Sequence, residues 1–261
     1  MIIFRQEWKR GKMSFLIWSG AIASMVILCM LLFPEMKDEM GDVSRLFSAM
    51  GAFTSAFGMD KINFGESLGF YGIECGNILG IVGAIFASLL GVSALADEEK
   101  NHTAEFLLTH PVSRMQVVWE KLLSVMTQIL AMNVLIVVIS AVSFRLIGED
   151  LPVREFLLMH AAYLMMQVEI AAICFGISAF LRRGGLGIGI GLATVLYFLN
   201  LVANISKSAD FLKYVTPFGY AEASDIISES ALNAGMMVIG AAVSLLCIAA
   251  AFREYGKKDI F

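Results

Sequence analysis

Charged residues are scarce in this chain. Asp, Glu, Lys and Arg make up 16% of its 261 residues, whereas hydrophobic residues make up 58%. A soluble globular domain has about 25% charged and about 45–50% apolar residues. Both departures indicate a membrane protein surrounded by a lipid bilayer. The formal net charge of −4 gives no support to nucleic-acid binding, which relies on a basic face.

Motifs for metal binding, redox chemistry and catalysis are also missing. No two of the four cysteines form a C-x-x-C pair, and each lies in or beside an apolar run, so we interpret them as small buried side chains. No G-x-x-x-x-G-K-[ST] motif for nucleotide binding occurs, and neither G-x-S-x-G nor H-E-x-x-H is found. We therefore expect no metal, no cofactor and no catalytic residue in the chain itself.

Long apolar runs dominate what is present. A helix that crosses a bilayer needs about 20 mainly apolar residues, and the ten-residue alternation of a transmembrane barrel is not seen. The first run is too long for the core of a signal peptide, and no small-residue cleavage site follows it. The sequence thus predicts an all-α polytopic membrane protein, one transmembrane domain over residues 1–261, with six transmembrane helices: 13–33, 71–95, 122–144, 156–181, 184–203 and 230–252.

The distribution of lysine and arginine predicts the orientation of these spans. Twelve lie on the side that holds both termini and the 96–121 loop, and seven lie on the other side. Cytoplasmic loops carry the excess of basic residues. We therefore expect a multi-pass protein of the cell (plasma) membrane with both termini in the cytoplasm.

Three further segments predict local structure. Residues 2–10 interleave basic and apolar side chains around Trp8, which is typical of an N-terminal interfacial helix. Residues 204–229 are too apolar for a solvated loop and too short to span the membrane, and Thr216-Pro217 interrupts them. Gly72, Gly76 and Gly80 form a face that allows close helix packing, more often within one chain than between two.

The segment 97–114, DEEKNHTAEFLLTHPVSR, is the longest densely polar stretch. Asn101 or Thr103 can cap a short helix, Glu105 suits its first turn, and Pro111 ends it. Its apolar side consists of Ala104, Phe106, Leu107 and Leu108. Ser113 to Gln116 then fits a capping box that opens the next membrane helix. A segment that only connects two spans would need neither an apolar helix face nor a helix that ends abruptly before the next one begins.

This segment resembles the coupling-helix region of ATP-binding-cassette (ABC) exporter permeases of the type-2 class. The resemblance rests on Glu99, Thr103, Glu105, Leu107, Leu108, Pro111, Val112, Ser113, Arg114 and Lys121, and on the ending Phe252-Arg253-x-Tyr255 with Lys258-Asp259-Ile260. The family usually has Gly before the Thr, where this chain has His102. The resemblance implies a homodimer of permeases, each paired with a cytoplasmic ABC ATPase that binds ATP and Mg. It also implies a cytoplasmic coupling helix and short re-entrant outer helices before the last span.

The same resemblance assigns roles to residues. It implies that Glu99, Thr103, Glu105, Phe106, Leu107, Leu108, Pro111 and Arg114 contact the ATPase. For the substrate, it favours export of amphipathic or antimicrobial peptides, or of another hydrophobic compound.

Glu169 and Gln167 lie near the middle of the fourth span, where a carboxylate costs roughly 2.5–3.5 kcal/mol to insert. Both are therefore candidates to line the substrate route, and a buried structural hydrogen bond is the alternative. Two other functions stay open: an ion-coupled secondary transporter that uses Glu169, and an intramembrane enzyme, for which His160 is the only membrane histidine.

Overall fold

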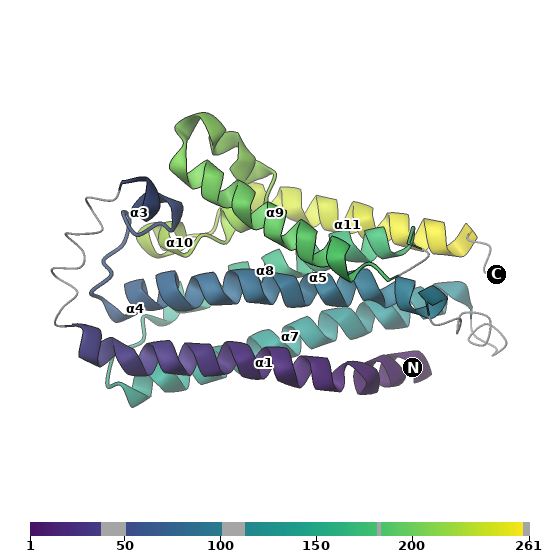
Figure 1. Ribbon diagram of the computed structural model, residues 1–261, viewed down its shortest axis with the longest axis horizontal. Helices are drawn as coiled ribbons and strands as arrows, with labels where there is room; N and C mark the ends of the chain where they lie inside the picture. The colour runs from purple at the N-terminus through teal and green to yellow at the C-terminus, as the bar shows by residue number, and fades with distance from the viewer. Residues whose placement is uncertain (38–50, 101–112, 182–183, 258–261) are drawn as a thin grey trace.

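The computed structural model describes residues 1–37, 51–100, 113–181 and 184–257 and forms a helical bundle (Figure 1). Its long helices are α1 (Ile2–Lys37), α5 (Gly76–Lys100), α7 (Arg114–Leu146), α8 (Val153–Ser178), α9 (Leu186–Ile205) and α11 (Ala234–Lys257). Two short segments, α4 (Ser67–Phe70) and the π-helical turn η1 (Tyr71–Cys75), extend α5 at its start. Within the described residues, six helices are long and apolar enough to cross a membrane. The predicted all-α fold with six transmembrane helices is confirmed.

The start of the chain differs from the prediction. Residues 2–10 do not form a separate interfacial helix, because α1 runs without interruption from Ile2 to Lys37. Gly11 is the only weak helix former between Arg10 and Ser14, and a single glycine costs a helix only about 1 kcal/mol. The side chains of α7 also hold the first turns of α1, as described below, so packing favours the continuous helix.

Helix α8 lies at the centre of the bundle. It packs against α5 on one side and α11 on another, while α1 packs against α7 and α9 against α5. Buried aromatic rings occupy the interior near Tyr71, whose ring centroid lies 5.4 Å from that of Phe144. His160, on which an intramembrane enzyme would depend, lies in this cluster with Nε2 3.0 Å from the Tyr71 hydroxyl. Its place is that of a packed and hydrogen-bonded core residue.

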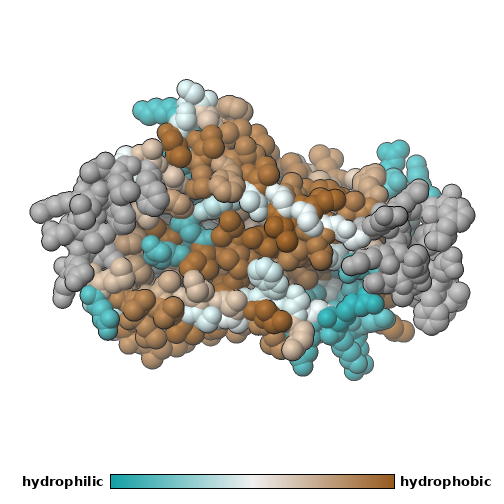
Figure 2. All heavy atoms as spheres, in the orientation of Figure 1, coloured by the Kyte–Doolittle hydropathy of each residue, from teal (hydrophilic) through white to brown (hydrophobic). Residues whose placement is uncertain are grey.

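The outside of the bundle is apolar across its middle. Figure 2 shows hydrophobic side chains over the central part of this face and hydrophilic ones toward the two ends. Exposed large apolar residues include Val138 on α7, Val195 on α9 and Leu246 on α11. Apolar surface of this extent is stable in lipid, so the chain is a multi-pass membrane protein.

Short helices cover the end of the bundle opposite the two termini (Figure 1). They are α3 (Ala52–Ala56), the 3₁₀ helices η2 (Lys207–Tyr214) and η3 (Pro217–Tyr220), and α10 (Ala223–Glu229). The last three lie between the fifth and sixth spans, where short helices were predicted. We refer to this end as the outer end, and to the end that holds the termini as the inner end.

The glycine face of the second span packs within the chain, as predicted. A Cβ atom at Gly72 would lie 2.7 Å from Cδ1 of Ile227, and one at Gly76 would overlap the Tyr163 hydroxyl. These glycines therefore let α8 and α10 approach α5 closely.

Candidate functional site

Gln167 joins three helices in the middle of the bundle. Its side chain is fully buried, accepts a 2.7 Å hydrogen bond from Asn133 Nδ2 of α7, and donates one of 3.4 Å to the Leu79 carbonyl of α5. Gly83 leaves room for it, because a Cβ atom there would overlap Gln167 Nε2. Both functional ends of the amide are thus paired, which indicates a structural bond between α5, α7 and α8.

Glu169 faces a different part of the molecule, although it is only two residues away. Its Oε2 accepts a 2.8 Å hydrogen bond from the Tyr220 hydroxyl of η3 and packs closely against Gly240 of α11. The side chain is 7% exposed and lines a cavity of about 60 Å³ between α8, α11 and the 3₁₀ segments. The structure therefore does not bring Gln167 and Glu169 together on one surface, and Glu169 borders the cavity beside α11.

Most of the predicted ATPase contact lies outside the described residues. This applies to Thr103, Glu105, Phe106, Leu107, Leu108 and Pro111, and the predicted coupling helix falls there too. Glu99 belongs to the last turn of α5, and Arg114 is the first residue of α7. Both helix ends lie at the inner end of the bundle, so the segment between them begins and ends there.

Ser113 opens α7 as predicted. Its Oγ accepts a 3.2 Å hydrogen bond from the backbone N–H of Gln116, which satisfies one of the free donors of the first turn. The side chain of Gln116 does not reach back to Ser113, as a full capping box would require. It donates instead to Glu120 Oε1 at 2.9 Å. The hydrogen bond from Gln116 N–H to Ser113 is therefore present as predicted, but the reciprocal bond from the Gln116 side chain is not. That side chain belongs to a larger cluster.

This cluster, which we call the inner clamp, consists of Glu120 and Lys121 of α7 and the residues of α1 that they contact. Glu120 Oε2 accepts a 3.0 Å hydrogen bond from the backbone N–H of Phe4, a free donor at the start of α1. Lys121 Nζ lies 2.9 Å from Glu7 Oε1, and the lysine side chain is 1% exposed. A carboxylate at a helix N-terminus is favourable because it meets the positive end of the helix dipole. The clamp fixes the first two turns of α1 to α7.

A cavity of about 250 Å³ adjoins the inner clamp between α1, α5 and α7. Acidic and basic groups face it together, and its remaining lining mixes hydroxyl, amide and apolar side chains: Glu7, Arg10, Ser14, Phe86, Ser93, Asp97, Lys121, Ser124 and Gln128 are among them. Because both signs of charge are present, the cavity has no strong preference for an ion of one sign.

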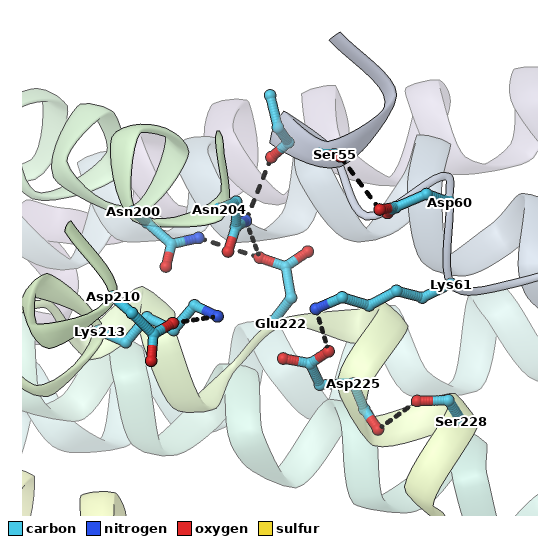
Figure 3. A network of polar contacts seen from close by, with 11 residues as sticks. Ser55, Asp60, Lys61, Asn200, Asn204, Asp210, Lys213, Glu222, Asp225 and Ser228 are labelled. Atoms are coloured by element: carbon cyan, nitrogen blue, oxygen red, sulfur yellow. Dashed lines mark hydrogen bonds and ion pairs between the residues drawn. The ribbon is translucent and has the colours of Figure 1, made fainter. Parts of the chain in front are cut away.

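A second polar group, which we call the outer cluster, is centred on Glu222 (Figure 3). Glu222 Oε2 accepts hydrogen bonds from Nδ2 of Asn200 at 2.9 Å and of Asn204 at 3.0 Å, both on the last turns of α9. Asn204 Nδ2 also donates to the Ala56 carbonyl of α3 at 3.2 Å, and Lys61 Nζ lies 2.5 Å from Asp225 Oδ1 of α10. Burial raises the pKa of Glu222, while the bonds from the two amides oppose that change.

Gly58 packs against the outer cluster at a position where a side chain would not fit. Its φ angle of +68° lies in the left-handed region, and a Cβ atom there would overlap the Ser224 hydroxyl and lie 3.1 Å from Glu222 Oε1. This cluster was not predicted from the sequence. The available signal was two amides four residues apart, Asn200 and Asn204, near the end of an otherwise apolar span. Such polar groups within a span need partners on another element.

Comparison with known proteins agrees with this architecture. The family described as ABC-2 family transporter protein matches residues 1–260. No curated protein matches the chain.

Proposed function

Because this chain belongs to the ABC-2 transporter family over residues 1–260, we propose that it is the membrane-spanning permease subunit of an ATP-driven exporter. In this proposal, ATP and Mg are bound by a separate cytoplasmic ABC ATPase, and two permease copies form the transport unit. The family is one of membrane subunits, and the sequence carries no phosphate-binding loop. The energy of hydrolysis would therefore arrive through contact with the ATPase.

The arrangement of the inner end is the observation that supports this proposal most directly. The segment 101–112 connects the end of α5 to a capped start of α7, and the first turns of α7 hold the start of α1 through the inner clamp. A partner that docks on the segment would therefore act on the ends of three spans at once. Since packed helices move as rigid elements, such a contact is suited to transmit a conformational change.

Purified permease is expected to show no ATP hydrolysis above background, and ATPase activity should appear when the partner ATPase is reconstituted with it in lipid. A permease-dependent rise in hydrolysis, together with ATP-dependent uptake of substrate into inside-out vesicles, would support the proposal. Rigorously ATPase-free permease that hydrolyses ATP would contradict it. Uptake driven by an ion gradient without ATP would favour the secondary-transporter alternative instead.

The proposal places both termini in the cytoplasm. The excess of lysine and arginine at the inner end supports this orientation. An impermeant maleimide added to intact cells should label Lys61→Cys and spare Lys257→Cys, and the reverse pattern would invert the topology.

The proposed substrate is an amphipathic peptide or another hydrophobic compound, and Glu169 is the proposed polar contact on its route. The cavity beside Glu169 is lined on one side by Met236, Ile239 and Val243 of α11, and its lining also includes the polar side chains of Lys213, Thr216 and Tyr220. Such a mixed lining suits an amphipathic ligand, because the polar groups orient the ligand while the apolar side chains bury its hydrophobic part.

We expect Glu169→Gln to alter substrate-stimulated ATPase activity while the protein still assembles, because glutamine keeps an acceptor for the Tyr220 hydroxyl. Tyr220→Phe serves as the complementary control, since it removes the hydrogen bond that Glu169→Gln retains and keeps the carboxylate. If Glu169→Leu transports at the parental rate with unchanged stability, Glu169 has neither the transport role nor a structural one. The measurement is substrate-stimulated hydrolysis and the thermal unfolding midpoint of each variant.

A further inference from the structure

A small cavity lies beside the outer cluster, between α5, α8 and α9 and beneath η3. Its volume is about 30 Å³, and its polar lining comes from four elements: Asn77 of α5, Tyr163 of α8, Tyr197 and Asn200 of α9, and Glu222. Gly72 of η1 and Gly76 and Gly80 of α5 form much of its remaining wall, and their lack of side chains leaves the space open. A cavity needs about 10–15 Å³ to hold one water-sized particle, so this one accommodates one or two.

Oxygen atoms without partners surround this cavity. Glu222 Oε1 accepts no hydrogen bond from the described residues, since both amide donors converge on Oε2. Asn200 is 4% exposed, and its Oδ1 is buried with no partner. Tyr163 is 3% exposed, and its hydroxyl forms no hydrogen bond within the described part of the chain. Buried polar atoms are normally paired. Asn200 Oδ1 is such an atom without a partner, and the cavity is also bordered by Glu222 and Tyr163, each with an oxygen that forms no hydrogen bond among the described residues, so we expect the cavity to hold something with which these oxygens interact.

The charge around the cavity selects the sign of that occupant. Glu222, Asp225 and Asp60 lie close together at the outer end and Lys61 faces them, while Lys213, which is also drawn there, is paired with Asp210 (Figure 3). Lys61 is already bonded to Asp225 Oδ1 at 2.5 Å, which leaves Glu222 without a direct ion pair among the described residues. Asn200 and Asn204 also lie on the last turns of α9, where the helix dipole presents its negative end. The local charge therefore favours a cation over an anion.

We propose that this cavity binds one alkali-metal cation of the size of sodium, held by Glu222, Asn200 and Tyr163. The donor set consists of oxygens only, which suits a hard ion. Calcium usually takes six to eight oxygen ligands, several of them carboxylates, and magnesium retains several waters for which about 30 Å³ leaves no room. A single carboxylate with neutral oxygens balances one positive charge. The bound ion would join α8, α9 and the outer helices, and this proposal does not depend on ATP-driven transport.

The test measures cation binding to the full chain, purified in lipid nanodiscs at fixed pH and ionic strength. Sodium chloride is exchanged for N-methylglucamine chloride, and the thermal unfolding midpoint and the heat of sodium binding are recorded. We expect a saturable rise of the midpoint with sodium, because a ligand that binds only the folded state stabilises it. Glu222→Gln should weaken sodium binding by at least about tenfold, since it removes the one negative charge in the site.

Two variants separate the site from general effects of salt. Glu229→Gln removes an exposed carboxylate at the end of α10 and should retain the parental response to sodium. Tyr163→Phe removes only an unpaired hydroxyl, so it should fold normally and still bind sodium more weakly, which keeps the test decisive if Glu222→Gln is unstable. Equal midpoints in the two salts, an unchanged response in both Glu222→Gln and Tyr163→Phe, or stabilisation by calcium but not by sodium would overturn the proposal.

Discussion

Glu120→Ala is expected to release the start of α1 from α7 and to lower the free energy of unfolding by about 1.5–3 kcal/mol, the usual contribution of a hydrogen bond to a charged group. Glu120 is 3% exposed and accepts bonds from the Phe4 backbone N–H and the Gln116 side chain. Alanine leaves both donors without their partner. The first turn of α1 also loses a carboxylate at the positive end of its dipole. The measurement is denaturant or thermal unfolding together with hydrogen exchange of the Phe4 amide.

Two further variants serve as controls for the expected loss of stability in Glu120→Ala. Glu35→Ala removes an exposed carboxylate at the other end of α1 and should change the unfolding free energy very little. Glu120→Gln keeps an acceptor for the Phe4 amide but removes the charge, so it should lie between the parent and the alanine variant. If Glu120→Ala exchanges the Phe4 amide no faster than the parent does, Glu120 does not hold α1 in place.

Properties that depend on one segment at a time could be predicted from the sequence. A span reveals itself by about twenty apolar residues in a row, whatever its neighbours are. The cap at Ser113 was also predictable, because it uses the backbone of its own helix. The close packing at the glycines of the second span was predictable too, because a residue without a side chain lets another helix approach. Each of these features depends on residues close together in the sequence, so the sequence alone is sufficient to predict it.

Properties that depend on a distant partner could not be predicted. The contacts of Glu120 and Lys121 with α1 could not be predicted, because their partners lie 114–116 residues earlier in the chain and nothing in the segment around Glu120 indicates them. Without those contacts, residues 2–10 resemble a free amphipathic segment, which explains the incorrect prediction of a separate interfacial helix. Glu169 likewise needed Tyr220, which lies 51 residues away. Which side chain pairs with a polar residue inside a bundle depends on how the helices pack, and the sequence around that residue does not show this.

Leu107→Ala and Phe106→Ala are expected to weaken association with the proposed ATPase by roughly thirtyfold each, because truncating a well-buried anchor costs upwards of about 2 kcal/mol. Both residues lie on the apolar side predicted for the segment 101–112, and the structure does not describe that segment. Apolar anchors with a charged rim are the usual anatomy of a tight contact. Glu105→Lys should weaken binding in a salt-dependent way, since a rim charge acts through screened electrostatics.

Matched controls come from apolar residues that are exposed at the outer end of the bundle. Leu146→Ala and Phe211→Ala make the same truncations where the side chains are 70% and 64% exposed, so they should leave ATPase binding unchanged. The measurement is the dissociation constant for the ATPase in nanodiscs, with substrate-stimulated hydrolysis for each variant. All variants should still insert and unfold at the parental midpoint, because positions 106 and 107 lie outside the six spans predicted from the sequence. Parental affinity and coupling in Phe106→Ala, Leu107→Ala and Glu105→Lys would show that the segment only connects α5 to α7, and the energy of ATP hydrolysis would then have to enter through another part of the inner end.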